Sequence, residues 1–381
     1  MSLCIRLQRG FFTLFVIALL LTNNACNKME PRAEISEVRI DVERATRDTI
    51  SFSELYCDVN FIPLENHRDG MLSYIMKMIV TDNGYIILNL DTHTSVLLFD
   101  QNGKFRGQVG GLGHGRGEYE LVFDVSTDNE GNIVLSTFEK FLIYDSNGKY
   151  LYSKEIPGNA YMKNILCHPR GAVCASNYSG SSSLLHFYDS SFRKQKEILK
   201  SGNLTFKNPS YTDNTLHCFG DTLCYYNPYS SAFTIVSLPQ IKPLKQYSLL
   251  SNNIFNIEKA KERENDLNKV MDLDYIDYYY LENGKIIGDF LYHHKGTYLE
   301  IDIRSDKYKL RVRNGWFPDI SDVHNQYYYA ILSQIDLLDL LNENMGLSQK
   351  SKQMIISAYE NMGQEITEKD NFVIMRLRKK L

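Results

Sequence analysis

The feature that most constrains the fold of this 381-residue chain is an internal repeat. Residues 81–105 and 127–150 align almost residue for residue, and their aromatic–Asp steps, Phe99-Asp100 and Tyr144-Asp145, lie about 45 residues apart. A weaker third copy, Leu185–Phe192, contains the step Tyr188-Asp189. In each copy Asp, Asn and Gly mark tight turns, and the apolar runs between them have the β-branched content of buried strands. The repeat therefore predicts short antiparallel strands joined by hairpins.

Four such strands in about 40–45 residues are the size of one β-propeller blade. A blade cannot bury both of its faces alone, so neighbouring blades must stack around an axis. Turn signals recur at six places, near Asn83, Asn129, Arg170, Asp221, Asn283 and Asn325. The sequence therefore predicts an all-β fold, a six-bladed β-propeller over residues 55–381.

The two ends of the ring are expected to close on each other, because an open propeller would expose two sheet edges. The strand-like segments 60–65 and 372–377 are predicted to pair or to lie adjacent in the last blade. Between about 333 and 368, apolar residues recur at steps of three and four, which predicts a small insert of two amphipathic helices. We expect these helices to cap one rim or edge of the last blade. The alternative is a helical pair that binds a partner.

The N-terminus has the pattern of an export signal. Arg6 and Arg9 precede the apolar run Phe11–Leu21, which is long enough for the core of a signal peptide and too short to span a bilayer as a mature helix. Ala25-Cys26 follows, and a small residue directly before a cysteine resembles the cleavage site of bacterial lipoproteins, although Asn23 stands where a leucine is usual.

The expected organisation follows from that site. Residues 1–25 are predicted to be a lipoprotein signal peptide, Cys26 is predicted to carry the lipid, and residues 26–54 to form a tether and N-terminal segment. The alternatives are plain secretion with cleavage nearby, or an uncleaved anchor. The first interpretation places the protein in the cell envelope, as an outer-membrane lipoprotein that faces the periplasm or the cell surface.

Five cysteines remain in the mature chain after lipidation of Cys26, namely Cys57, Cys167, Cys174, Cys218 and Cys224. Cys167 and Cys174 flank one predicted turn, and Cys218 and Cys224 flank another, so both pairs could form disulfides in an oxidising compartment. The favoured alternative is that all five are small buried hydrophobic residues.

A family resemblance adds to this picture. The segments Phe99–Phe105 and Val109–Tyr119 resemble the signature of the six-bladed β-propeller lipoproteins common in Bacteroidota, which are relatives of NHL-repeat propellers. In that family the glycine-rich stretch usually reads G-x-G-x-G-P-G-E-Y, and here Arg116 replaces the proline. Residues 368–374 resemble the closing strand of the family, which usually has a proline after the asparagine. The resemblance implies the fold, export and lipid anchoring, and it implies no biochemical activity.

Charge and motifs limit the functional classes. The formal net charge is -4 and no basic tract is interleaved with aromatic residues, which argues against nucleic acid as a partner. The cysteines and histidines lack the spacing of a zinc site, and no Gly-x-Ser-x-Gly motif occurs. The favoured function is therefore non-catalytic and free of cofactors. It is the binding of an envelope protein, a glycan or a peptide at one mouth of the central funnel.

Two groups of residues are candidates for that binding. The glycine-rich segment 110–117 could hold an anion with the help of His114 and Arg116, and Glu118 and Tyr119 are expected near the rim of the funnel. The favoured alternative is that the glycines let the chain cross closely between blades. Tyr279 and Tyr328 belong to tyrosine clusters suited to sugar or peptide recognition, with filling of the space between blades as the favoured alternative.

The alternative function is catalytic. It is a calcium-assisted propeller hydrolase, lyase or lactonase in which carboxylates from several blades hold the cation near the axis. The candidate ligands are Asp124, Asp289 and Asp322.

Overall fold

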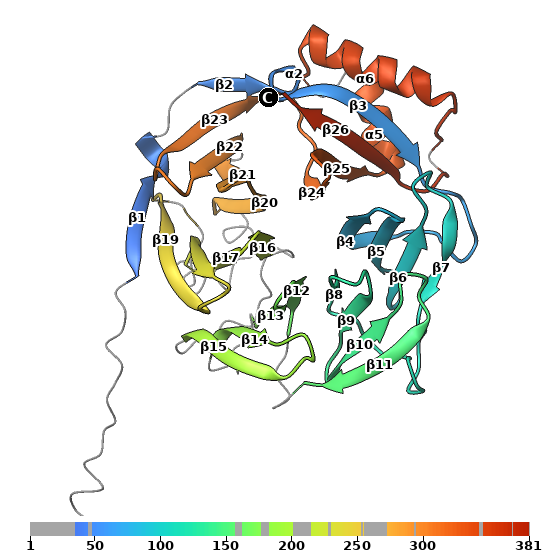
Figure 1. Ribbon diagram of the computed structural model, residues 1–381. Coiled ribbons are helices and arrows are strands. Elements are labelled where there is room, and N and C mark those ends of the chain that lie inside the picture. Colours follow the sequence, from blue (N-terminus) through green and yellow to red (C-terminus); the bar gives the residue numbers. More distant parts are fainter. Residues whose placement is uncertain are drawn as a thin grey trace, which may run out of the picture. The chain divides into compact units, whose positions relative to one another are not determined.

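Six sheets surround a common axis in the computed structural model of the protein (Figure 1). The structure describes residues 35–44, 48–156, 162–176, 183–200, 215–227, 230–252, 254, 273–292, 295–342, 346–367 and 369–380. The predicted signal peptide and Cys26 lie outside these residues. Glu37–Leu381 form one unit and Met1–Ser36 another. The description below concerns the unit Glu37–Leu381.

The first three blades contain four antiparallel strands each and follow one another along the chain. Blade 1 consists of β4 (Tyr74–Thr81), β5 (Gly84–Leu90), β6 (Thr94–Phe99) and β7 (Phe105–Val109). Blade 2 consists of β8 (Asp124–Thr127), β9 (Ile133–Ser136), β10 (Lys140–Tyr144) and β11 (Tyr150–Glu155). Blade 3 consists of β12 (Asn164–His168), β13 (Gly171–Ala175), β14 (Ser183–Tyr188) and β15 (Lys194–Lys200).

Blades 4 and 5 have a fifth, outermost strand that comes from the N-terminal part of the chain. Blade 4 consists of β16 (Leu216–Phe219), β17 (Thr222–Asn227), β18 (Ala232–Ser237), β19 (Lys242–Leu250) and β1 (Ser36–Asp41), which is followed by the 3-10 turn η1 (Val42–Arg44). Blade 5 consists of β20 (Tyr275–Glu282), β21 (Lys285–Tyr292), β22 (Lys295–Asp302), β23 (Tyr308–Asn314) and β2 (Thr49–Ser51). The propeller therefore includes strands before residue 55, where the sequence predicts its start, because β1 and β2 are short and carry no repeat signature.

Blade 6 closes the ring. It consists of β24 (Ile320–His324), β25 (Tyr327–Leu332), β26 (Val373–Lys379) and β3 (Tyr56–Pro63). The outermost strand β3 pairs antiparallel with β26, with Phe61 opposite Met375. The predicted pairing of the N-terminal and C-terminal segments is therefore confirmed, and so is the six-bladed β-propeller. All six turn signals lie in hairpins between the first and second strands of the blades.

Recurring Asp residues shape the outer hairpins. Asp100 Oδ1 accepts hydrogen bonds from the N–H groups of Asn102 (2.8 Å) and Lys104 (2.9 Å). Asp145 and Asp189 make the same pair of contacts, with the residues two and four positions further on. An Asp side chain that binds the backbone ahead of it stabilises a turn without help from elsewhere. The aromatic–Asp step seen in the sequence is therefore the point where the third strand ends.

The helical insert lies between β25 and β26, as predicted. It consists of α5 (Gln334–Leu341), capped by Ser333, and α6 (Gln349–Met362), which ends at Gly363 with a φ of 68°. α6 packs against β3 and the short helix α2 (Phe52–Leu55), and Ile355 is buried in the same cluster as Phe52 (Figure 1). The insert thus covers an edge of the last blade. No helix in the described part of the chain is long and apolar enough to cross a membrane.

All five cysteines of the described residues are free. The register places Ala172 opposite Cys167 and Leu223 opposite Cys218, so the residues of each suggested pair are not direct partners across their hairpins. Cys174 and Cys224 are buried, Cys167 and Cys218 are partly exposed and Cys57 is exposed, so the interpretation that all five cysteines are buried is wrong for Cys57 and holds fully for Cys174 and Cys224 only.

Candidate functional site

The ring has two faces, which we name by their loops. On the connector face the innermost strand of each blade begins, and the connections between blades lie there together with the turns between second and third strands. On the turn face the innermost strand turns into the second strand. The register of blade 1 places Tyr74 beside Leu90 and Leu90 beside Thr94 at the connector face. Val122 N–H donates to Thr94 Oγ1 (2.8 Å), which brings the start of blade 2 to the same face.

The glycine-rich loop after β7 is folded onto itself at the connector face. Tyr119 N–H donates to the carbonyl of Gly111 (2.9 Å), and Gly113 N–H donates to the carbonyl of Tyr119 (3.1 Å). The carboxylate of Glu118 accepts a hydrogen bond from Gly115 N–H (2.8 Å). Gly113 has a φ of 154°, and a Cβ atom there would lie 2.1 Å from Glu118 Oε2. The loop therefore needs glycine so that Glu118 can fold back over it.

The same loop is anchored between blades 1 and 2. The Tyr119 ring is buried in the cluster shared by these blades, and its hydroxyl donates to the carbonyl of Val109 (2.9 Å). Burial raises the pKa of Tyr119. A Cβ atom on Gly117 would lie 2.7 Å from the Tyr150 ring, and the Arg116 guanidinium lies over that ring at 5.5 Å. These contacts support the interpretation that the glycines allow a close crossing between blades.

A pocket of about 560 Å³ opens between this loop and the turn that joins β9 to β10. Its lining residues are Gly113, His114, Glu118, Tyr119, Glu120, Leu121, Thr137, Phe138, Glu139 and Lys140. The pocket therefore brings together three of the predicted binding residues, His114, Glu118 and Tyr119, and it does not include Arg116. The imidazole of His114 lies 3.4 Å from Glu120 Oε1, and both side chains are largely exposed.

The turn between β9 and β10 supplies the residues that the sequence analysis missed. Thr137 Oγ1 donates to the carbonyl of Lys140 (2.8 Å), which closes a tight turn. The turn presents Phe138, which is 51% exposed while its ring packs edge-on against Phe123 at 4.7 Å. Thr137–Lys140 contains no glycine, proline or asparagine, so it gave no turn signal. The signal that could have found it is a phenylalanine placed between two buried strands.

Tyr279 and Tyr328 lie away from this pocket, between blades. The Tyr279 side chain is buried, and its hydroxyl donates to the carbonyl of Thr215 (2.6 Å). Tyr328 is buried in the cluster shared by blades 5 and 6, and its hydroxyl donates to Glu282. Both rings therefore fill space between blades, which was the favoured interpretation. Strand alternation does not expose every second residue here, because both faces of a blade pack against neighbours.

The carboxylate of the candidate metal ligand Asp124 accepts hydrogen bonds from both neighbouring blades and so joins blades 1, 2 and 3. It begins β8 and accepts hydrogen bonds from Lys77 Nζ (2.9 and 3.0 Å) and from Ile165 N–H (2.8 Å). Burial raises the pKa of Asp124, and the contacts with Lys77 and with the backbone oppose that shift. The innermost strand of a blade leaves N–H groups unpaired along the axis, and this carboxylate satisfies one of them.

Asp322 makes the same kind of contact at the closing seam, which is the junction of blade 6 with blade 1. It lies on β24 of blade 6 and accepts a hydrogen bond from Val80 N–H on blade 1 (2.6 Å). Burial raises the pKa of Asp322 to about 6, since the hydrogen bonds from Val80 and Val323 offset only part of the desolvation. The geometry thus matches that of Asp124, except that Lys77 acts on Asp322 through its charge and donates its hydrogen bonds to Asp124.

Asp289, the third candidate ligand, has a different partner, the guanidinium of Arg313. It lies on the second strand of blade 5, β21, and its carboxylate is 2.5 Å from Arg313 Nη1. The three candidate aspartates therefore come from three different blades and engage different groups. Within the residues that the structure describes, no group of three or more His, Cys, Asp or Glu side chains is arranged to hold one metal ion.

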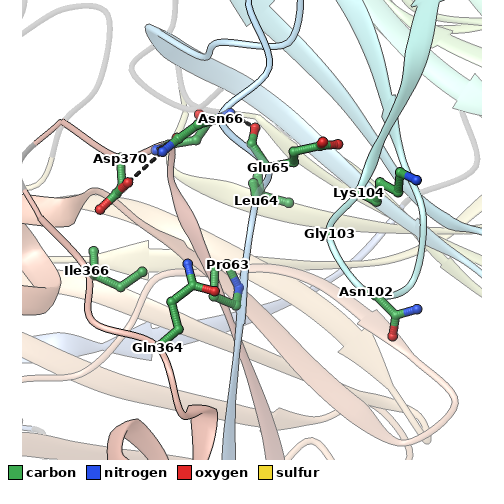
Figure 2. A pocket seen from close by; sticks show the side chains of 11 residues that line it. Pro63, Leu64, Glu65, Asn66, Asn102, Gly103, Lys104, Gln364, Ile366 and Asp370 are labelled. Atoms are coloured by element: carbon green, nitrogen blue, oxygen red, sulfur yellow. Dashed lines mark hydrogen bonds between the residues drawn. The ribbon is translucent and has the colours of Figure 1, made fainter.

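A second pocket, of about 320 Å³, lies where the ring closes (Figure 2). Asn66 Nδ2 donates to Asp370 Oδ1, and Asn371 N–H donates to Asn66 Oδ1. Asn371 Nδ2 in turn donates to the carbonyls of Glu65 and Gly70. These polar groups join the end of β3 to the segment before β26, so we assign this pocket to the closure of the ring.

The comparisons place the chain in a family. The protein family described as "Domain of unknown function (DUF4934)" matches residues 37–378 of this chain. The chain belongs to this DUF4934 family. The matched range begins within β1, so the two added strands of blades 4 and 5 are part of the DUF4934 domain, as are the glycine-rich loop and the helical insert. The comparison with curated proteins gives no match.

Solved structures resemble the DUF4934 chain in fold. A Bacteroides fragilis NCTC 9343 protein classed as exported has a TM-score of 0.68 at 18% identity, over 91% of this chain and 100% of that one. The Pan2 WD40 domain of Neurospora crassa has a TM-score of 0.45 at 12% identity, over 74% of this chain and 94% of that one. At these identities the likeness of the first structure supports the propeller fold and nothing further.

Proposed function

We propose that this DUF4934 chain is an exported, non-catalytic binding protein that holds its ligand on the connector face of the propeller. The ligand is an envelope protein, a glycan or a peptide, and binding uses no cofactor. The observation that carries the proposal is the pocket beside Phe138, where an exposed aromatic ring lies next to carboxylates and a lysine. A flat apolar ring beside hydrogen-bonding groups is a common arrangement for recognising sugars and peptides.

We further propose that the chain is an NHL-like lipoprotein held at the outer membrane through Cys26. Support comes from the N-terminal sequence, in which basic residues, an apolar run and Ala25-Cys26 follow one another. The Bacteroides fragilis structure is also that of a protein classed as exported. A cysteine with two or three acyl chains would anchor the protein stably. The ring would then be presented to the periplasm or to the cell surface.

The anchor can be tested by itself. A Cys26→Ser variant is expected to lose labelling by a radioactive fatty acid and to leave the membrane fraction. Unchanged labelling and partitioning would overturn the lipoprotein assignment, and would leave the binding proposal to its own test.

The binding proposal is tested by a matched pair of variants. Phe138 on the connector face and Phe219 on the turn face are exposed to a similar degree, 51% and 45%. The anchored protein is purified in mild detergent as wild type, Phe138→Ala and Phe219→Ala. We expect a molecule that co-purifies with the wild type to be retained by Phe219→Ala and lost by Phe138→Ala. Equal retention by both variants would contradict a site on the connector face.

A further inference from the structure

Exposed apolar side chains occur on segments of three consecutive blades that reach the connector face. Six large hydrophobic residues over blades 6, 1 and 2 are exposed, namely Met71 (44%), Tyr74 (57%), Leu90 (36%), Leu112 (58%), Phe138 (51%) and Ile335 (61%). They come from different segments of the chain, which are the β3–β4 connection, blade 1, the glycine-rich loop, the β9–β10 turn and α5. Figure 1 shows that blades 6, 1 and 2 follow one another around the ring.

Hydrogen bonds and register hold these segments on the same face. Tyr74 is the cross-strand partner of Leu90, and Ser73 N–H donates to Asn89 Oδ1 (2.8 Å). The contact between Val122 and Thr94 joins the glycine-rich loop to blade 1. α5 begins directly after β25 ends at Leu332, at the connector end of blade 6. The β3–β4 connection, blade 1 and the glycine-rich loop therefore lie on one face, and α5 starts at the same end of blade 6.

The Phe138 ring packs edge-on against Phe123, yet each of these six side chains still exposes a large part of its surface to solvent. Solvent-facing apolar groups of this size, gathered on one side of a protein, are typical of interaction surfaces. Their aliphatic and aromatic character suits a polypeptide, because a neutral sugar chain would need paired hydroxyl contacts over the same area.

The charge of the adjoining pocket indicates which polypeptide fits. Three exposed carboxylates, those of Glu118, Glu120 and Glu139, line it together with the ammonium group of Lys140 and the imidazole of His114, which lies 3.4 Å from Glu120. A lysine or arginine side chain could enter with its apolar stem along Phe138 and its charge toward the carboxylates.

We propose that the connector face over blades 6, 1 and 2 binds a basic polypeptide segment of a partner protein. Its apolar side chains pack on the exposed hydrophobic residues, and a lysine or arginine occupies the pocket beside Phe138. This inference rests on the proposed function and names the class of its ligand.

The probe is a short fluorescein-labelled peptide of alternating lysine and leucine, added to the purified full-length chain in mild detergent. Matched peptides replace lysine by glutamate or leucine by serine. We expect the lysine–leucine peptide to bind at least about tenfold more tightly than either control, with an affinity that falls as salt rises. Equal binding of the glutamate–leucine peptide would overturn the charge argument, and equal binding of the lysine–serine peptide would overturn the apolar one.

Variants locate the site. Phe138→Ala, and separately the double variant Glu120→Gln/Glu139→Gln, are expected to weaken binding of the lysine–leucine peptide about tenfold. Phe219→Ala and Asp221→Asn, on the turn face, serve as controls and are expected to leave it unchanged. Equal losses on both faces would overturn the proposal. If the peptide fails to bind while co-purification still depends on Phe138, the partner is of another class and the proposed function stands. If both fail, both proposals fall.

Discussion

On the turn face, most of the hairpin turns contain Asp, Asn or Gly, whereas on the connector face Leu112, Phe138 and Ile335 are each more than half exposed. Backbone geometry sets the first pattern. Asn283 and Asn325 both have a φ of 50°, a conformation that favours asparagine and glycine. On the other face, the loop after β7 has its own positive-φ glycines, Gly113 and Gly117, whereas the β9–β10 turn that carries Phe138 contains no glycine. Backbone geometry therefore explains the turn-face hairpins, whereas we propose that the exposed side chains of the connector face serve recognition.

The largest effect is expected inside the ring, at the carboxylate that joins blades 1 to 3. Asp124→Ala leaves Lys77 buried without its partner and exposes the N–H of Ile165, so the free energy of unfolding should fall by about 3–5 kcal/mol. Urea denaturation measures this loss. The double variant Lys77→Met/Asp124→Asn removes both charges and should recover most of it, because replacing a buried pair is tolerated far better than breaking it. A double variant as unstable as Asp124→Ala would contradict this account.

The next largest effect concerns a hairpin of the turn face. Gly84 has a φ of 128°, and a Cβ atom there would lie 2.0 Å from the carbonyl oxygen of Phe99. Gly84→Ala should therefore lower the free energy of unfolding by about 3 kcal/mol while leaving ligand binding intact.

Gly131 provides the matched control for that variant. It has a φ of 77°, and a Cβ atom there would have no neighbour within 4 Å, so Gly131→Ala tests backbone conformation without the collision. We expect a loss of about 1 kcal/mol in thermal or chemical unfolding. Equal losses for the two variants would show that the collision does not set the stability of the turn face.

The closing seam should make stability depend on pH. The folded-state pKa of Asp322 is about 6, above the ordinary value of 3.8, so the native state binds this proton more tightly than the unfolded state does. Between pH 4 and pH 6, stability should therefore fall as pH rises, by about 2 kcal/mol after allowance for partial exposure. Asp322→Asn should remove this component from a series of denaturation curves. An unchanged pH profile in the variant would assign the dependence to other groups.

The smallest effect on stability is expected on the connector face. Phe138→Ala and Leu112→Ala remove side chains that are mostly in solvent, so the free energy of unfolding should change by no more than about 0.5 kcal/mol. Differential scanning calorimetry measures this. A large loss for Phe138→Ala would mean that the ring serves packing against Phe123 rather than recognition.

The sequence predicted most of the fold because the blades are built locally. The aromatic–Asp–Asn–Gly pattern around Asp100 and Asp145 makes its own turn contacts, so a repeat in sequence becomes a repeat in structure. The pairing of β3 with β26 was predictable because a ring needs closure. β1 and β2 were not predictable, because short added strands depend on the edge they meet and carry little pattern of their own.

The candidate site was predicted only in part, because it combines two segments that come together only when the chain folds. His114, Glu118 and Tyr119 came from a conspicuous loop, whereas Phe138 and Lys140 lie on a turn of ordinary residues that folding brings beside that loop. The bond between Lys77 and Asp124 joins residues of neighbouring blades, and no local pattern marks it. Tyr279 and Tyr328 were candidates because strands alternate, yet stacked blades bury both faces.

The most direct test of the central claim, that the connector face is the binding surface, is photo-crosslinking in cells. The photoreactive residue p-benzoylphenylalanine replaces Phe138 in one version of the anchored protein and Phe219 in another, since the two rings are similarly exposed on opposite faces. We predict a discrete crosslinked product from position 138 and none from position 219. Crosslinks from position 219 alone, or of equal yield from both, would contradict the claim.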